Sequence, residues 1–232
     1  MDTASPMNQR TPCVALFDLD GTLTWHDTLM AFLIGYAARR PTRWLRLWKL
    51  LPAFLGYLAF DRDRGLLKSR AIRAVMGADS RPAIDTWADA FVASLKSRGV
   101  FRPAALAALE AHRAAGDHLV LLSASPDLYV PRIGRLLGFE RTLCTEVKWQ
   151  DHRPNGERLD GALLTPNRRG EEKSRCLAWL RTQYAGLPVI AYGNSASDLP
   201  HLGQADRGIL VNGSAGARRA AVKRGLAVAD WA

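Results

Sequence analysis

Val14 to Thr24 reads VALFDLDGTLT, and this stretch decides the fold. Its first four residues are all apolar, which is typical of a strand buried on both faces of a parallel sheet. Asp18 and Asp20 follow two positions apart, so an extended chain points both carboxylates to the same side, and Gly21 allows a sharp turn away. Because open α/β sheets bind ligands at the carboxyl ends of their strands, we expect a functional site here.

Beyond residue 100, apolar strands alternate with helical patterns. We predict helices over 103–115, 127–137, 171–184 and 198–202, and strands over 118–123, 142–147, 189–192 and 208–211, the last of the chain. A polar run to Leu164, with Asn155-Gly156 and Asp160-Gly161, predicts an exposed β-hairpin. The alternation predicts an α/β fold with a Rossmann-like, doubly wound parallel sheet.

Residues 27–99 show helical spacing and no buried strand, with helices predicted from Asp27 or Thr28 and over 66–76 and 82–96. We therefore predict an all-helical cap over 27–99, inserted into a catalytic core of 13–26 and 100–232. Residues 1–12 form a flexible N-terminal lead in this scheme.

Composition is that of an ordinary globular protein, with 48% hydrophobic and 23% charged residues among 232. Cys13, Cys144 and Cys176 show no CxxC pairing, so we expect small buried side chains in a reducing compartment. The chain start lacks the apolar core of a signal peptide, and the uncharged run 50–60 is shorter than the roughly 20 residues that span a bilayer. A cytoplasmic location is expected.

Four motifs occur in a fixed order along the chain. DLDGTLT after the first strand is followed by Ser123 in LLSASP, Lys173 in RRGEEKSRCL, and Asn194 with Asp198 in YGNSASD. From about residue 13 onward the chain resembles the haloacid-dehalogenase-like (HAD) phosphohydrolases. The LLSAS and YGNSxSD strings and the helical insertion after the first motif are similar to the phosphoserine-phosphatase-like branch of that family.

This resemblance implies a magnesium-dependent phosphatase acting on phosphomonoesters. It implies that Asp18 is the nucleophile, forming an aspartyl-phosphate, and that Asp20 is the general acid and base. Mg²⁺ would be held by Asp18, Asp20 through its carbonyl, Asn194 and Asp198. The phosphate-binding residues would be Ser123, Lys173, Gly21 and Thr22.

Electrostatics explains why such a site needs cations. A carboxylate 4 Å from a phosphate dianion meets roughly 8 kcal/mol of repulsion at an effective dielectric constant of 20. A magnesium ion and Lys173 would cancel it. Taken singly, Ser123 reads as a turn serine, Lys173 as a solvated lysine and Asp198 as a helix N-cap, so only the joint order of the motifs supports the enzyme.

One residue departs from the family pattern. Gly193 is followed by Asn194, where many members have Asp, and an amide oxygen brings no charge to a metal. We expect activity to survive this change; a catalytically weak HAD-like binding protein is the alternative.

The cap bears on the choice of substrate. In this branch of the family an acidic residue soon after the first motif can bind a substrate amine, and Asp27 occupies a comparable position. The alternative is that Asp27 caps a helix. Ten Lys or Arg and two Asp lie between Arg39 and Arg73, and Arg39–Phe60 reads RRPTRWLRLWKLLPAFLGYLAF. The interleaved basic and aromatic residues indicate either a peripheral membrane contact serving a phosphatidylglycerophosphate-type lipid phosphatase, or a cap core filled by Trp44, Trp48 and Phe54.

The expected partner is a phosphorylated small molecule, and the chain is expected to be a monomer or homodimer. A net charge of +10 suits nucleic-acid binding, but the sequence contains no recognised nucleic-acid-binding motif. We therefore expect no nucleic acid as a partner. A response-regulator receiver also uses an Asp and a Lys on a parallel sheet. Its acceptor follows an interior strand, however, and the helical insertion is foreign to it.

Overall fold

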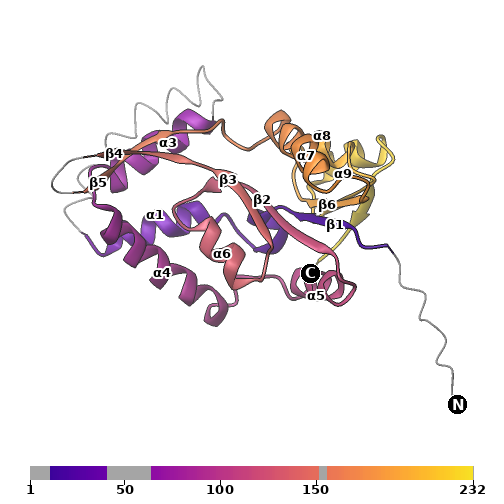
Figure 1. Ribbon diagram of the computed structural model, residues 1–232, viewed down its shortest axis with the longest axis horizontal. Helices are drawn as coiled ribbons and strands as arrows, with labels where there is room; N and C mark the ends of the chain where they lie inside the picture. The colour runs from indigo at the N-terminus through magenta and orange to yellow at the C-terminus, as the bar shows by residue number, and fades with distance from the viewer. Residues whose placement is uncertain (1–10, 41–63, 152–155, 232) are drawn as a thin grey trace, which may run out of the picture.

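A parallel sheet of six strands forms the core of the computed structural model, which describes residues 11–40, 64–151 and 156–231 (Figure 1). Its strand order is β3-β2-β1-β6-β7-β8. The strands are β1 (Val14–Phe17), β2 (His118–Pro126), β3 (Arg141–Thr145), β6 (Val189–Gly193), β7 (Arg207–Val211) and β8 (Ala227–Ala229). The predicted α/β fold with a doubly wound parallel sheet is confirmed.

Helices cover both faces of this sheet. Ala15 and Phe17 of β1 point into a core shared with α5 (Pro103–Ala114) and α6 (Val130–Leu136). Val14 and Leu16 point into a second core. The helices on that side are α7 (Glu171–Gln183), α8 (Leu199–Leu202) and α9 (Ala215–Val222). The all-apolar VALF run is thus buried on both faces, as its pattern predicts.

Three details of the core differ from the sequence prediction. The last strand is β8 rather than 208–211, and α9 precedes it. The buried residues of α9 are Ala217 and Ala221, which give little hydrophobic signal. Helix α6 begins at Val130 rather than Asp127, whose carboxylate accepts a hydrogen bond from the Val147 backbone N–H instead.

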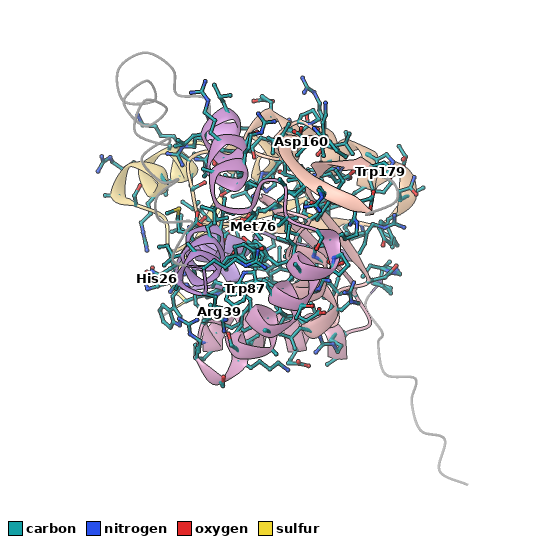
Figure 2. All side chains as sticks on the ribbon, turned by 90° about the vertical axis from the view of Figure 1, so that its left-hand side faces the viewer. His26, Arg39, Met76, Trp87, Asp160 and Trp179 are labelled. Carbon is teal, nitrogen blue, oxygen red and sulfur yellow. The ribbon has the colours of Figure 1, made fainter. Side chains whose placement is uncertain are left out.

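Among the described residues of the cap, seen to the left in Figure 1, the helices are α1 (Thr28–Ala38), α3 (Arg64–Met76) and α4 (Arg81–Ser97). Phe32, Trp87 and Phe91 pack ring against ring inside it, and Met76 and Trp87 are buried among its helices (Figure 2). The helices expected from the sequence are therefore present. The alternatives for Trp44, Trp48 and Phe54 concern residues outside the described ranges.

The predicted hairpin is β4 (Val147–Asp151) paired antiparallel with β5 (Glu157–Leu163). It is not fully exposed, however, because Val147 and Leu159 are buried. The turn between α3 and α4 bonds to β5 through Ala78 N to Leu159 O at 2.9 Å and Leu159 N to Asp79 O at 3.0 Å. Figure 1 shows the hairpin lying along α3, so a segment that follows β3 of the core packs with the cap.

The topology places a crevice at the carboxyl end of β1. This strand lies between β2 and β6, with Phe17 opposite Leu121 on one side and Tyr192 on the other. Connections leave the two sides in opposite directions, which opens a ligand crevice at such a switch point. Within the described ranges, no helix combines the length and the apolarity that crossing a bilayer requires.

Candidate active site

The first motif forms a tight loop directly after β1. Thr24 N donates to Leu19 O at 3.1 Å, and Gly21 sits in the middle of the loop with φ of +80°. A Cβ on Gly21 would lie 2.0 Å from Nδ2 of Asn194. Glycine is required here both by its backbone conformation and by the side chain lying over it.

Lys173 joins two aspartates from distant parts of the chain. It lies in the first turn of α7, and its Nζ donates to Asp18 Oδ1 at 2.6 Å and to Asp198 Oδ1 at 2.7 Å. Lys173 is 2% exposed. Although burial acts to lower its pKa, the two carboxylates raise the pKa of Lys173 above its ordinary value. The lysine is therefore a fixed positive charge at the floor of the crevice.

Asp18 is a buried carboxylate with capacity left to bind. One oxygen accepts from Lys173, and the other accepts from Thr22 Oγ1 at 3.1 Å. Burial raises the pKa of Asp18 to about 7, Lys173 opposes this shift, and Asp198 adds to it. Because a carboxylate offers about four acceptor positions, Asp18 can still contact a ligand or an ion.

Asp198 holds the loop after β6. Its Oδ2 accepts from Ser195 N at 2.9 Å, from Ser195 Oγ at 2.7 Å and from Asn194 N at 3.3 Å. Although burial acts to raise its pKa, Lys173 lowers the pKa of Asp198 below its usual range. Asp198 precedes α8, yet its side chain makes no capping hydrogen bond to that helix. Its contacts fix Asn194 in the crevice instead.

Asp20 faces the cap rather than Lys173. Its Oδ1 accepts from Thr28 N at 2.7 Å and Thr28 Oγ1 at 2.6 Å, and its Oδ2 accepts from Ser125 Oγ at 2.6 Å. Burial raises the pKa of Asp20, and the charge of Asp27 adds to the shift, while these hydrogen bonds oppose it. The carboxyl group is thus held in one orientation, with a raised affinity for a proton.

A cavity of about 660 Å³ lies between cap and core above these groups. Of the residues predicted to bind phosphate, Gly21 and Lys173 line it, whereas Ser123 and Thr22 are fully buried and do not. Ser123 Oγ accepts from Ser125 N at 3.0 Å, so Ser125 is the serine of that motif that reaches the cavity.

Asp27 plays the role of a helix cap. Its Oδ1 accepts from Met30 N at 3.0 Å, which confirms the capping alternative. Asp27 also lines the cavity, so its predicted contact with a substrate amine stays a prediction.

Three residues that line the cavity were not predicted from the sequence: the cations Lys68 and Arg169, and the neutral Asn167. Lys68 reaches from α3 of the cap to the core, where its Nζ donates to Asn167 Oδ1 at 2.7 Å and to the Ala124 carbonyl. Burial lowers the pKa of Lys68 to about 8. In the sequence, Lys68 is one of ten basic residues in its region, and nothing distinguishes it from the others.

The donor atoms of the site fit magnesium. Asp18 and Asn194 line the cavity, and their side chains carry carboxylate and amide oxygens, which are the hard ligands that Mg²⁺ prefers. Asp18 and Asp198 are both buried and share the single positive charge of Lys173, so a divalent cation beside Asp18 would offset the remaining negative charge. Asp198 accepts four hydrogen bonds, from Lys173, from Asn194 N and twice from Ser195, against two for Asp18, which makes Asp198 less open to a metal ion than Asp18.

Fold and site together define a Rossmann-like α/β protein with an acidic, lysine-bridged site beneath a helical cap. Residues 15–203 match the sequence model of the haloacid dehalogenase-like hydrolases, and the chain belongs to this family.

Relatives of known sequence or structure agree with this assignment. The chain is 34% identical to Protein CicA of Caulobacter vibrioides over 196 residues, which is 84% of each chain. A structure of a protein of unknown function from Bordetella pertussis Tohama I has a TM-score of 0.77 at 26% identity, covering 96% of this chain and 100% of the other. A phosphoserine phosphatase in a phospho-aspartyl analogue form has a TM-score of 0.63 at 12% identity, covering 96% and 95%. The fold is therefore that of the phosphoserine-phosphatase-like branch.

Proposed function

We propose that this protein is a magnesium-dependent phosphomonoesterase that hydrolyses a small phosphorylated metabolite through an aspartyl-phosphate on Asp18. The observation that carries the proposal is the 2.6 Å contact between Lys173 Nζ and Asp18 at the floor of the cavity. A carboxylate paired with a fixed cation is suited to attack an anionic phosphate. A cytoplasmic location belongs to the same proposal.

In the first step an oxygen of Asp18 attacks phosphorus. The new bond joins this oxygen to phosphorus, and the bond from phosphorus to the leaving alcohol breaks. Lys173 keeps its proton throughout and offsets the charge of the phosphate oxygens. Magnesium, when bound by Asp18, the Asp20 carbonyl and Asn194, would supply further positive charge to those oxygens.

Asp20 moves the protons in both steps. It gives its proton to the oxygen of the leaving alcohol, and it then takes one from the water that attacks phosphorus and releases Asp18. A general acid at neutral pH needs a raised pKa, which burial gives to Asp20. Thr28 and Ser125 keep the carboxyl group aimed through three hydrogen bonds.

Replacing the nucleophile tests the mechanism. Asp18→Asn keeps the size of the side chain but removes the attacking charge, so phosphate release should fall by about three orders of magnitude or more. The measurement is release of inorganic phosphate from a panel holding phosphoserine, histidinol phosphate, sugar phosphates and phosphatidylglycerophosphate, with magnesium and with a chelator. Asp89→Asn, on the solvent-exposed side of α4, is the matched control. Undiminished activity of the Asp18 variant would refute the mechanism.

Asn194 offers a second test because it departs from the family pattern. Asn194→Asp adds a negative charge to the proposed ligand set, so activity should be kept and magnesium should bind more tightly. The measurement is the magnesium concentration at half-maximal activity, together with calorimetric titration of magnesium into the phosphate-free protein. Weaker magnesium binding by the variant would show that Asn194 is not at the metal.

A further inference from the structure

We infer that the leaving alcohol of the substrate carries a hydrocarbon body, which packs against an apolar wall of the cap. This inference rests on the proposed function and names its substrate class. The wall, called here the cap wall, consists of residues on α1 and α3 that line the cavity: Leu29, Met30, Leu33, Leu67 and Ala71.

The cap wall is a continuous feature of two helices. Leu29 and Leu33 are four residues apart on α1, as are Leu67 and Ala71 on α3, so each pair presents one helix face. The two helices are packed against each other. Leu29 and Leu33 are held by the cap core, whereas Met30 is 54% exposed. Apolar surface that remains accessible inside a cavity favours an apolar ligand group.

Opposite the cap wall lie the polar groups of the proposed chemistry. Asp18, Asp20, Lys173 and Ser125 line the same cavity from the core. A bound ligand is therefore expected to be anionic at its core end and hydrocarbon at its cap end. A substrate with a fully polar alcohol would leave the cap wall uncovered.

The size of the cavity agrees with such a ligand. At about 660 Å³ it lies within the range of roughly 300–1,000 Å³ that holds drug-sized molecules. A phosphate attached to two or three carbons would fill only part of it. The polar residues that line the cavity from α3 are the cations Arg64 and Lys68, which suit the phosphate rather than the alcohol, and Asp27 already accepts the Met30 N–H.

A chain-length series tests the inference on the wild-type protein. The substrates are ethyl, butyl, hexyl and octyl phosphate below their aggregation concentrations, with phosphoserine as the polar reference. Each methylene that reaches the cap wall should raise kcat/KM by about twofold to fourfold until the wall is covered. A flat or falling series would overturn the inference while leaving the phosphatase itself established.

A binding measurement separates this inference from the proposed function. Calorimetry with the matching n-alkyl phosphonates and the Asp18→Asn variant needs no turnover, and affinity should rise with chain length in the same way. If none of the phosphates is hydrolysed, the proposed function fails, whereas the phosphonate series still decides whether the cap wall binds hydrocarbon. Affinity that does not depend on chain length would overturn the inference.

Variants on neighbouring residues locate the effect. Leu67→Ser removes apolar surface from the cap wall, so it should flatten the chain-length dependence while ethyl phosphate remains a substrate. Leu66→Ser is the matched control, because Leu66 is 40% exposed and does not line this cavity. Ala71→Ser provides a milder change should Leu67→Ser reduce stability. Equal responses of the Leu66 and Leu67 variants would contradict the assignment of the cap wall.

Discussion

Lys68 is a desolvated cation whose hydrogen bonds go to neutral oxygens. Its Nζ donates to Asn167 and to the Ala124 carbonyl, and burial lowers its pKa to about 8. An ammonium group has three N–H donors, which leaves one for an anionic ligand in the cavity. Burial lowers the pKa of Lys68 more than the nearby charges of Asp20 and Asp27 raise it, so Lys68 is placed to gain from a phosphorylated substrate.

We therefore expect Lys68→Met to weaken substrate binding. A hydrogen bond to a charged group contributes about 1.5–3 kcal/mol, so KM should rise about tenfold or more, with a smaller change in kcat. Steady-state kinetics measure both constants. The exposed Arg70→Met on the same helix is the control, since it removes the same charge outside the cavity. Equal effects of both changes would indicate general electrostatics rather than a specific contact.

Ser125 tunes the acid that we assign to Asp20. Its hydroxyl donates to Asp20 Oδ2 at 2.6 Å and so lowers the pKa of that carboxyl group. Ser125→Ala should raise this pKa, and the alkaline limb of the kcat/KM profile, which reports the protonated acid, should move to higher pH. The measurement is kcat/KM between pH 5 and 9. A shift toward lower pH, or none, would remove Ser125 from this role.

The sequence predicted the residues that meet at Lys173 but not all of their neighbours. Asp18, Lys173 and Asp198 could be found because each belongs to a motif at a strand end or helix start. Ser125 could not be distinguished from Ser123, because the β2–β3 register shifts between Ser123 and Pro126 and changes which side chain faces the cavity. Lys68 was missed because its contacts join residues 56 and 99 positions apart.

At the scale of elements, local patterns predicted most helices and strands, and packing between distant segments decided the rest. The β4–β5 hairpin was predicted from its turn residues, yet its contacts with α3 involve no local signal. Helix α9 was missed because two alanines, Ala217 and Ala221, form its buried face, and strand β8 was missed because it has three residues and none of them is fully buried. Asp160-Gly161, expected at a turn, lies inside β5 instead.

Gly161 shows how closely the hairpin packs on the cap. It has φ of +85°, and a Cβ there would lie 2.9 Å from the backbone of Arg73 on α3. Gly161→Ala should lower the free energy of unfolding by about 2–4 kcal/mol, because backbone strain and overpacking add. Gly156→Ala is the matched control, since its φ is +74° but nothing lies within 4 Å.

Chemical denaturation of both glycine variants measures the difference. The control should lose only the strain of the left-handed conformation, about 1–2 kcal/mol. The excess loss in Gly161→Ala then reports the contact between hairpin and cap. Equal losses would mean that the hairpin can shift away from α3 without lowering the free energy of unfolding.

At the scale of the whole molecule, cap and core are joined where the chain crosses between them. Thr24 forms an isolated antiparallel β-bridge with Phe101, and Trp25 N donates to Val100 O at 3.1 Å. The guanidinium group of Arg102 lies over the Trp25 ring. The hairpin is a further connection, since it leaves β3 of the core and pairs with the cap. The cavity lies between these joints, so its shape depends on the stability of the junction.

Asp127 lies where the hairpin leaves the core, and its carboxyl group makes the free energy of unfolding depend on pH. Its carboxylate accepts from Val147 N at 3.1 Å at the start of the hairpin, and burial raises its pKa from 3.8 to about 6. A raised pKa in the folded state means that the folded protein holds the proton more tightly. The resulting stability is present below pH 4 and is lost as the pH rises through 6.

Asp127→Asn should abolish this loss while keeping an oxygen that can accept from Val147. The melting temperature of the variant minus that of the wild type should therefore increase from pH 4 to pH 7, corresponding to about 2 kcal/mol. Taking the difference at each pH cancels the contribution of Asp18 and the other carboxyl groups, which both proteins share. A difference that stays constant or decreases over this range would mean that Asp127 is ionised in the folded protein as readily as in the unfolded chain.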